Sequence, residues 1–215
     1  MNTQTTLRRS TLGACALALG LGMFQAQADD GALYGPKAPK GSAFVRAYNA
    51  SSAELDVSVG QTQLKQVAPL GSSDFKFLPA GSYQAQVGST QMPVDLQAER
   101  YYTLVSQTGA KPRLVEEPPF TSRQKALLRV QNLTDSTLSL KTADGKTAVV
   151  ADVKPDGRGD REINPVKVGL ALFDGERKVA DLKPVTLERG EVVSLFVTGG
   201  QGKLSPVWVK RPIDG

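Results

Sequence analysis

The side chains that could do chemistry gather in two segments of this 215-residue chain. The first, Lys154–Glu162, reads KPDGRGDRE and is dense in charge and glycine. Its carboxylates could bind calcium, although they lack the spacing of an EF-hand loop, and Arg158 and Arg161 could hold an acidic group. We favour a flexible, charged loop between strands over a ligand site. Such a loop could still bind a partner, because loops on a rigid scaffold often carry binding.

The second segment, Val207–Arg211, contains the only tryptophan. Successive side chains of a strand point to opposite faces, so Trp208 shares a face with Lys210. If the flanking valines face the core, Trp208 is exposed beside a cation and could contact a sugar ring or a protein partner. If Trp208 faces the core, it anchors the C-terminal domain, and both alternatives stay open. Because tryptophan and arginine dominate many protein interfaces, we predict a binding surface from both segments. Its residues are Trp208, Lys210, Arg211, Arg158 and Arg161.

Catalytic chemistry is limited by what the sequence lacks. The chain has no histidine, and its one cysteine, Cys15, lies in a segment that we expect to be removed. Histidine is the commonest general acid–base near neutral pH, and zinc, copper and haem use histidine or cysteine ligands. The adjacent Glu116 and Glu117 would point to opposite faces of a strand, whereas a glycosidase needs two carboxylates on one cleft. We therefore predict no enzyme activity, no cofactor and no metal site.

Residues 1–28 have the three parts of a secretory signal peptide. They are a basic head at Arg8-Arg9, an apolar run too short to span a bilayer, and a small-x-small exit at Ala26-Gln27-Ala28. Lipidation at Cys15 and a twin-arginine route are weaker alternatives. We expect a soluble protein that starts at Asp29 and is not embedded in a membrane. Because it would then have no disulfide, the bacterial periplasm is the predicted location.

The charge of the chain says little about partners. Two of the 26 basic residues and none of the 21 acidic ones lie in the signal, which leaves 24 − 21 = +3. The basic residues are dispersed among acids, whereas nucleic-acid binders usually concentrate them on one face or run. We predict no nucleic-acid partner.

Alternating apolar and polar residues predict strands in the rest of the chain. Leu55, Val57 and Val59 form one such pattern, and a longer strand is expected from Val166 to Leu172. Short strands between turns predict an all-β fold. Asp144-Gly145 and Asp174-Gly175 are the predicted hairpin turns, because glycine readily adopts the positive φ that such turns need.

The two halves of the chain look like copies. FVRAYN at 44–49 matches LLRVQN at 127–132, and YTLV at 102–105 resembles VSLF at 193–196. We predict two tandem small antiparallel β-sandwich domains. In each copy an arginine precedes an asparagine by three positions, at Arg46 and Asn49 and at Arg129 and Asn132. The arginines could be equivalent ligand contacts, but we favour asparagines that begin turns and arginines on a solvent face or in ion pairs between strands.

Paired prolines mark the boundary between the copies, because proline cannot donate a ladder hydrogen bond. Each copy is long enough to fold alone. The predicted organisation is a signal peptide at 1–28, an extended arm at 29–42, an N-terminal β-sandwich at 43–117, a linker at 118–125 and a C-terminal β-sandwich at 126–215.

Long, ordered blocks carry a family resemblance. They include ALYGP at 32–36, LVEEPPF at 114–120, QKAL at 124–127, REINPVKV at 161–168 and SPVWVKRP at 205–212. Over nearly its whole length the chain resembles the F protein family of alginate biosynthesis, an accessory factor for alginate O-acetylation. The resemblance brings no established functional residues with it.

The resemblance implies a periplasmic protein that is needed to acetylate the exopolysaccharide alginate. It implies periplasmic SGNH-type acetyltransferases and a membrane-bound O-acyltransferase as partners. Those SGNH enzymes use a Ser-His-Asp arrangement, which this chain cannot form. We therefore expect a non-catalytic adaptor that holds the acetylation components together. The alternatives are a polyuronate-binding module that presents alginate to the acetyltransferase and, as the weakest, an acetyltransferase itself.

Overall fold

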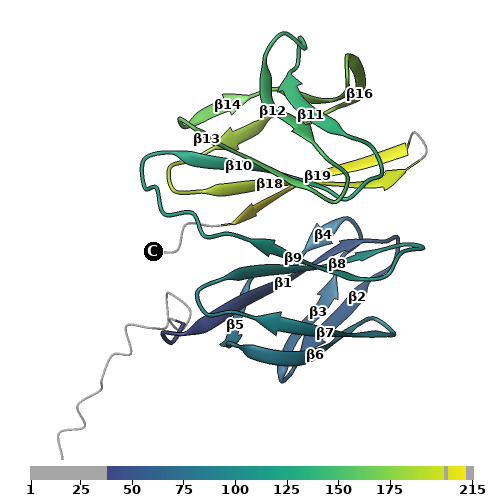
Figure 1. Cartoon of the computed structure of the whole chain (residues 1–215), viewed down its shortest axis with the longest axis vertical. Coiled ribbons are helices and arrows are strands. Elements are labelled where there is room, and N and C mark those ends of the chain that lie inside the picture. The colour runs from purple at the N-terminus through teal and green to yellow at the C-terminus, as the bar shows by residue number, and fades with distance from the viewer. Residues whose placement is uncertain (1–37, 201–202, 212–215) are drawn as a thin grey trace, which may run out of the picture. The chain divides into compact units, whose positions relative to one another are not determined.

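The structure is a computed structural model that describes residues 38–200 and 203–211 (Figure 1). The predicted signal peptide and most of the predicted arm lie outside the described residues. The described residues form strands and turns but no helix, and so contain no helix with the length and apolar character needed to cross a membrane.

Nine strands make up the N-terminal half, from residue 42 to residue 117. They are β1 (Ser42–Ala50), β2 (Leu55–Val59), β3 (Thr62–Val67), β4 (Gly71–Ser72), β5 (Lys76–Pro79), β6 (Gly81–Val87), β7 (Thr90–Leu96), β8 (Tyr101–Gln107) and β9 (Arg113–Glu117). One sheet has the order β4-β1-β8-β9, with β5 also paired to β1, and the other has the order β3-β2-β6-β7.

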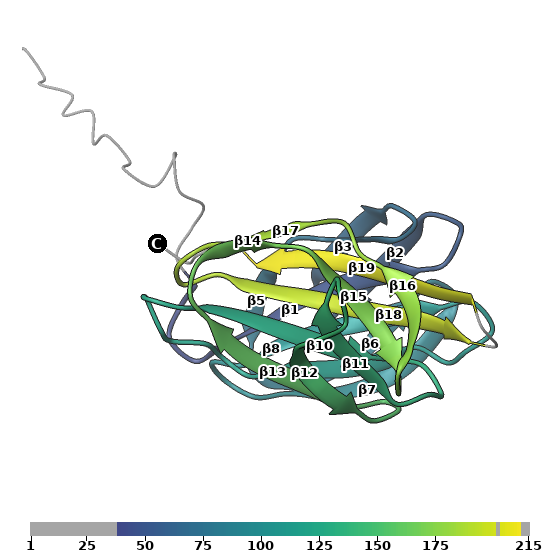
Figure 2. The ribbon, with the colours of Figure 1, turned by 90° about the horizontal axis from the view of Figure 1, so that it is seen from above.

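Ten strands make up the C-terminal half, from residue 126 to residue 211. They are β10 (Ala126–Asn132), β11 (Leu138–Thr142), β12 (Ala148–Val153), β13 (Arg158–Ile163), β14 (Val166–Val168), β15 (Leu170–Asp174), β16 (Arg177–Asp181), β17 (Val185–Leu187), β18 (Val192–Gly200) and β19 (Lys203–Arg211). The sheets have the orders β13-β10-β18-β19 and β12-β11-β15-β16, and a small sheet pairs β14 with β17 (Figure 2).

Each half has its own hydrophobic core, which follows from the alternation of its strands. In β1 the odd-numbered residues Ala43, Val45 and Ala47 belong to one core. In β10 the residues Ala126, Leu128 and Val130 belong to a second one, which includes no residue of the N-terminal half. The predicted all-β fold with two tandem β domains is therefore confirmed. No strand lies between Glu117 and Ala126, and independent folding of the two halves stays a prediction.

The register of the strands supports the internal repeat. Arg46 lies opposite Thr103 where β1 pairs with β8, and Arg129 lies opposite Ser194 where β10 pairs with β18. Both of these pairs are parallel, whereas all other strand pairs of the described residues are antiparallel. Alternation within a strand does not reveal the direction of its neighbour, so the sequence did not predict these parallel pairs.

Two local predictions were wrong. The single strand expected from Val166 to Leu172 is two strands, because the chain leaves the β14–β17 sheet and enters the β11–β15 sheet at Gly169. The segment expected to be a flexible loop is mostly strand β13, paired along β10. A Cβ atom at Gly159 would collide with Val150 of β12, so this glycine permits close packing of the edge strand.

Candidate functional site

The outer faces of the sheets that contain β1 and β10 pack against each other. A third apolar cluster joins the halves and contains Tyr48, Val105, Leu133, Phe196 and Val209. The rings of Tyr48 and Phe196 stack with their centroids 4.6 Å apart. The strands at this contact are therefore covered on both faces. One face packs in the core of its own half, and the other packs against the second half.

Glu117, the last residue of β9, lies at the centre of this contact and is fully buried. Its Oε1 accepts a hydrogen bond from Arg46 Nη2 at 2.6 Å, and a second one from the Thr103 hydroxyl. The same hydroxyl accepts a hydrogen bond from Arg46 Nε at 2.9 Å. The planar guanidinium also lies over the ring of Phe75, 4.5 Å from its centroid, so the N-terminal half surrounds Arg46 on several sides.

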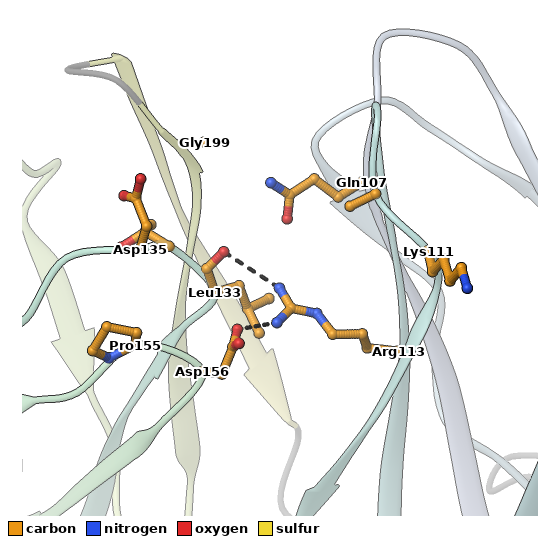
Figure 3. Close-up of a pocket in the computed structure, with 10 residues that line it drawn as sticks. Gln107, Lys111, Arg113, Leu133, Asp135, Pro155, Asp156 and Gly199 are labelled. Atoms are coloured by element: carbon orange, nitrogen blue, oxygen red, sulfur yellow. Dashed lines mark hydrogen bonds and ion pairs between the residues drawn. The ribbon is translucent and has the colours of Figure 1, made fainter.

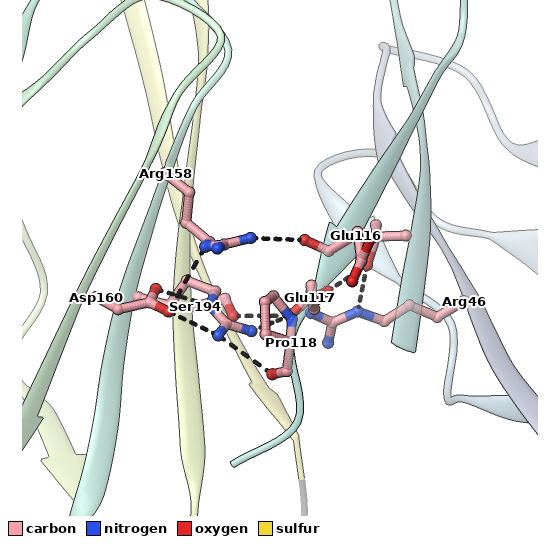
Figure 4. Close-up of polar contacts among 9 residues, drawn as sticks. Arg46, Glu116, Glu117, Pro118, Arg158, Asp160 and Ser194 are labelled. Atoms are coloured by element: carbon pink, nitrogen blue, oxygen red, sulfur yellow. Dashed lines mark hydrogen bonds and ion pairs between the residues drawn. The ribbon is translucent and has the colours of Figure 1, made fainter. Parts of the chain in front are cut away.

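The C-terminal half reaches the same carboxylate from the opposite side (Figure 4). The Ser194 hydroxyl donates to Glu117 Oε2 at 3.2 Å, and Arg129 Nη1 lies 3.7 Å from that oxygen. Arg129 is also bound by both carboxylate oxygens of Asp160, through Nε at 2.9 Å and Nη2 at 2.8 Å. We call this set the central network. Its members are Arg46, Thr103, Glu117, Arg129, Asp160 and Ser194.

The electrostatics of the central network favour an ionised Glu117. Burial by itself raises the pKa of this carboxyl group, but the charges of Arg46 and Arg129 and the hydrogen bonds from Thr103 and Arg46 together hold it below its ordinary value. A buried carboxylate between two buried guanidinium groups is compensated only while all three are present. The network therefore stabilises one particular packing of the two halves.

The asparagines of the repeat have the local role that the sequence predicted. The Asn49 side-chain oxygen accepts a hydrogen bond from the backbone N–H of Ser51, and the Asn132 oxygen accepts one from Thr134. The arginines of the repeat are in ion pairs, as favoured, but the ion pairs cross from one half to the other as well as between strands.

The structure separates the residues of the predicted binding surface. Arg158 lies at the contact of the halves, where its Nη1 donates to the backbone oxygen of Glu116 at 3.1 Å. Arg161 is exposed on the edge strand β13. Trp208, Lys210 and Arg211 lie on β19, at the other edge of the same sheet.

Trp208 occupies the inner face of that sheet. It lies opposite Leu195, packs against the C-terminal core, and donates from Nε1 to the backbone oxygen of Lys183 at 3.1 Å. Its flanking valines, Val207 and Val209, face the N-terminal half. Sequence alternation gave the correct pairing of faces, but it considered only one core and missed that both faces of β19 could be covered.

The cations beside Trp208 are also engaged. Lys210 lies 3.0 Å from a carboxylate oxygen of Glu191 and donates to the Thr186 backbone oxygen at 2.9 Å. The guanidinium of Arg211 is buried over the ring of Tyr101, 4.1 Å from its centroid. A binding role for Trp208, Lys210, Arg211, Arg158 and Arg161 stays a prediction. Of these five, only Arg161 is exposed without a partner among the described residues.

A cleft of about 650 Å³ opens between the halves at the turn from β8 to β9 (Figure 3). Residues of both halves line it, among them Gln107, Lys111, Asp135 and Asp156. Arg113 spans it by pairing with Asp156 and donating to the Leu133 backbone oxygen at 3.3 Å. The charges that line the cleft are balanced, and Arg113 is already neutralised, so the cleft selects no obvious ligand.

Chemistry at these sites is limited by the available groups. No cluster of three or more histidine, cysteine or acidic residues suited to a metal ion is found in the described part of the chain. In the central network Arg46, Glu117 and Arg129 are buried, and their charged groups are already paired with one another or with Asp160. Sequence reasoning missed Glu117 as its centre, because only the fold reveals that Arg46 and Arg129 approach one carboxylate.

Comparison with known proteins gives a consistent family match. The family model described as "Alginate O-acetyl transferase AlgF" matches residues 16–194. The chain is 70% identical to a protein from Pseudomonas aeruginosa named alginate biosynthesis protein AlgF, over 99% of both chains. It is 63% identical to a protein of the same name from Azotobacter vinelandii, over 92% of this chain and 94% of that protein.

Solved structures of two separate domains of AlgF from Pseudomonas aeruginosa are also similar to parts of the chain. The C-terminal domain is 76% identical, with a TM-score of 0.39, and covers 41% of this chain and 99% of its own. The N-terminal domain is 65% identical, with a TM-score of 0.35, and covers 38% of this chain and 100% of its own.

Proposed function

The chain belongs to the AlgF family of alginate biosynthesis proteins, and from this premise we propose that it is a periplasmic, non-catalytic adaptor. In this role it holds the acetyltransferase components of alginate O-acetylation together by protein–protein contacts. The family name connects the chain to O-acetylation of alginate, and the adaptor role is our inference from the structure.

The observation that carries the proposal is the buried contact between the halves. An adaptor has to present its binding surfaces at a fixed separation, which requires two domains that do not move freely. Here Glu117 binds Arg46 of its own half and lies beside Arg129 of the other half, with apolar rings packed beside them. Inter-domain motion is the default expectation unless the contact is substantial and apolar, and this contact supports a single arrangement.

The absence of histidine from the whole sequence supports a non-catalytic role. Acyl transfer by a serine nucleophile needs an adjacent base, and histidine is the usual one. Ser194, the buried serine of the central network, donates a hydrogen bond to Glu117 and lies away from solvent. Purified protein should therefore show no turnover of an acetyl ester. Turnover that scales with protein and survives a second purification would contradict the non-catalytic role.

The adaptor role is tested by binding. We expect the purified chain to bind the SGNH-type acetyltransferase of the same bacterium saturably in isothermal titration calorimetry, and to show no heat with polymannuronate. Binding to the polymer without binding to the enzyme would favour a polyuronate-binding module instead. Intact-mass analysis of the periplasmic fraction tests the location, because export with cleavage predicts a chain that starts at Asp29.

A further inference from the structure

The C-terminal half carries a group of unpaired basic side chains at one end. Five exposed residues there have no ion pair and no side-chain hydrogen bond among the described residues. Strand β14 at the same end carries Val166, a large apolar residue that is 44% exposed. We call the five residues, together with Val166, the end patch. The basic members are Arg123, Lys125, Arg161, Lys167 and Arg189.

Backbone contacts bring these residues together from four separate segments. Gly190 donates its N–H to the Lys125 backbone oxygen at 2.8 Å, which places the turn with Arg189 beside Lys125. Strand β14 pairs with β17, which leads into that turn, so that Val166 lies opposite Leu187. The end of β13, two residues beyond Arg161, lies opposite the start of β10, directly after Lys125.

The charge of this end is not compensated locally. Its nearby acids are Glu162, Glu188 and Glu191, and Glu191 is already bound by Lys210. With Lys210 counted, six basic and three acidic residues give 6 − 3 = +3. The basic excess, which looked dispersed along the sequence, is therefore concentrated in space.

The hairpins β11–β12 and β15–β16 of the same half show the contrast. Their charged residues are nearly balanced, four basic against five acidic, 4 − 5 = −1. Three ion pairs there have N···O distances of 3.0 to 3.2 Å: Lys141–Glu176, Arg177–Asp174 and Lys178–Asp181. Most charges of these hairpins are thus paired within the protein, whereas the basic residues of the end patch are not.

We propose that the end patch is the surface on which an acidic protein partner docks. This inference rests on the adaptor function, and it predicts that the acetyltransferase binds this part of the chain through an acidic face. Protein interfaces usually combine apolar contacts with polar ones, and this end offers both kinds of side chain. Opposite charges steer such partners together and make association sensitive to salt. A sugar polymer is disfavoured, because the only tryptophan packs against the C-terminal core.

Charge reversal tests the proposal in the full-length exported protein. The double variant Lys125→Glu/Arg189→Glu should weaken binding to the purified acetyltransferase at least tenfold at low salt. Wild-type binding should weaken as sodium chloride rises, whereas the variant should lose most of this dependence. The matched control is Lys65→Glu/Lys146→Glu, which reverses two exposed lysines elsewhere and changes the net charge equally. The control should bind as the wild type does.

The apolar residue of the end patch is tested separately. Val166→Ser keeps every charge of the end patch and should weaken binding several-fold without changing its salt dependence. Each variant should melt at the temperature of the wild type, because all the altered side chains are exposed. Thermal melting therefore checks that the variants are folded.

The possible outcomes separate this inference from the adaptor function. If the wild type binds the acetyltransferase and the reversed patch binds equally well, or the control loses as much, the end patch is wrong and the adaptor stands. If the reversed patch loses only polymannuronate binding, the patch belongs to the polymer and the proposal is overturned. If the wild type does not bind the enzyme at all, both proposals are wrong.

Discussion

The two halves place equivalent arginines on equivalent strands but give them different partners. Arg46 relies on Glu117 for its carboxylate and on the ring of Phe75 for contact. Arg129 has Asp160 of its own half and reaches Glu117 only at 3.7 Å. The N-terminal half thus supplies the acid that the two arginines share, whereas Arg129 already has the carboxylate of Asp160 from its own half. Glu117 is therefore the one acid of the central network that lies beside both repeat arginines.

The position of that residue shows how the copies diverged. Glu117 lies opposite Tyr101 where β9 pairs with β8, and Arg211 lies opposite Val192 where β19 pairs with β18. Glu117 and Arg211 are therefore at equivalent positions of the repeat, with opposite charge. An acid in both copies would have put two carboxylates at the contact. The difference allows the N-terminal copy to bind both repeat arginines, while Arg211 packs on Tyr101.

Removal of the shared carboxylate should have the largest effect. Glu117→Gln leaves two guanidinium groups buried with less compensation, which typically costs about 3–5 kcal/mol of unfolding free energy. The matched control is Glu116→Gln, because Glu116 is exposed and pairs with exposed Arg100, a kind of pair worth about 0–1 kcal/mol. Urea denaturation of both variants measures the difference. Equal losses would show that the central network does not hold the halves together.

The difference in stability between the wild type and Glu117→Gln should depend on pH through the ionisation of Glu117. Its pKa is lower in the folded protein than in the unfolded chain, so its stabilisation is complete above the ordinary carboxyl pKa of about 4.3. It is lost as the pH falls from there through the lower folded value. The difference in unfolding free energy between wild type and Glu117→Gln should be constant from pH 7 to about 5 and shrink below that range. A difference that grows on acidification would contradict an ionised Glu117.

A double-mutant cycle sharpens the comparison between the two arginines. The coupling of Arg46→Met with Glu117→Gln should exceed the coupling of Arg129→Met with Glu117→Gln by about 1 kcal/mol, because only Arg46 makes a direct hydrogen bond to Glu117. Arg129→Met should instead couple to Asp160→Asn. If both arginines couple equally to Glu117, the asymmetry of the halves is energetically unimportant.

Alternation and turn residues predicted the all-β class, the tandem copies, the asparagine turns and which residues of β19 share a face. The central network was beyond such reasoning, because a strand pattern tells which residues share a face but not what covers that face. Trp208 illustrates this limit. Alternation placed either Trp208 or the valines of β19 in the core, and it did not predict that these valines pack against the other half. The end patch was missed for a similar reason, since its residues come from segments that only the fold brings together.

The smallest expected effect concerns one turn that both halves share. Pro69-Leu70-Gly71 and Pro155-Asp156-Gly157 make the same turn, in which the glycine N–H donates at 3.0 Å to the backbone oxygen three residues earlier. The middle residue is left-handed in both, with φ of 54° at Leu70 and 55° at Asp156. Aspartate and asparagine tolerate this conformation, whereas for most other residues it costs roughly 1–2 kcal/mol.

Leu70 bears that cost while 47% exposed, so its packing offsets little of it. Leu70→Asn should therefore raise the unfolding free energy by about 0.5–1 kcal/mol, because asparagine relieves the strain. The equivalent change, Asp156→Asn, relieves no strain and removes the charge that pairs with Arg113. It should lower stability by less than about 1 kcal/mol, since the pair is largely exposed. Chemical denaturation of both variants should thus give opposite signs, and a destabilised Leu70→Asn would mean that the leucine packs more firmly than its exposure indicates.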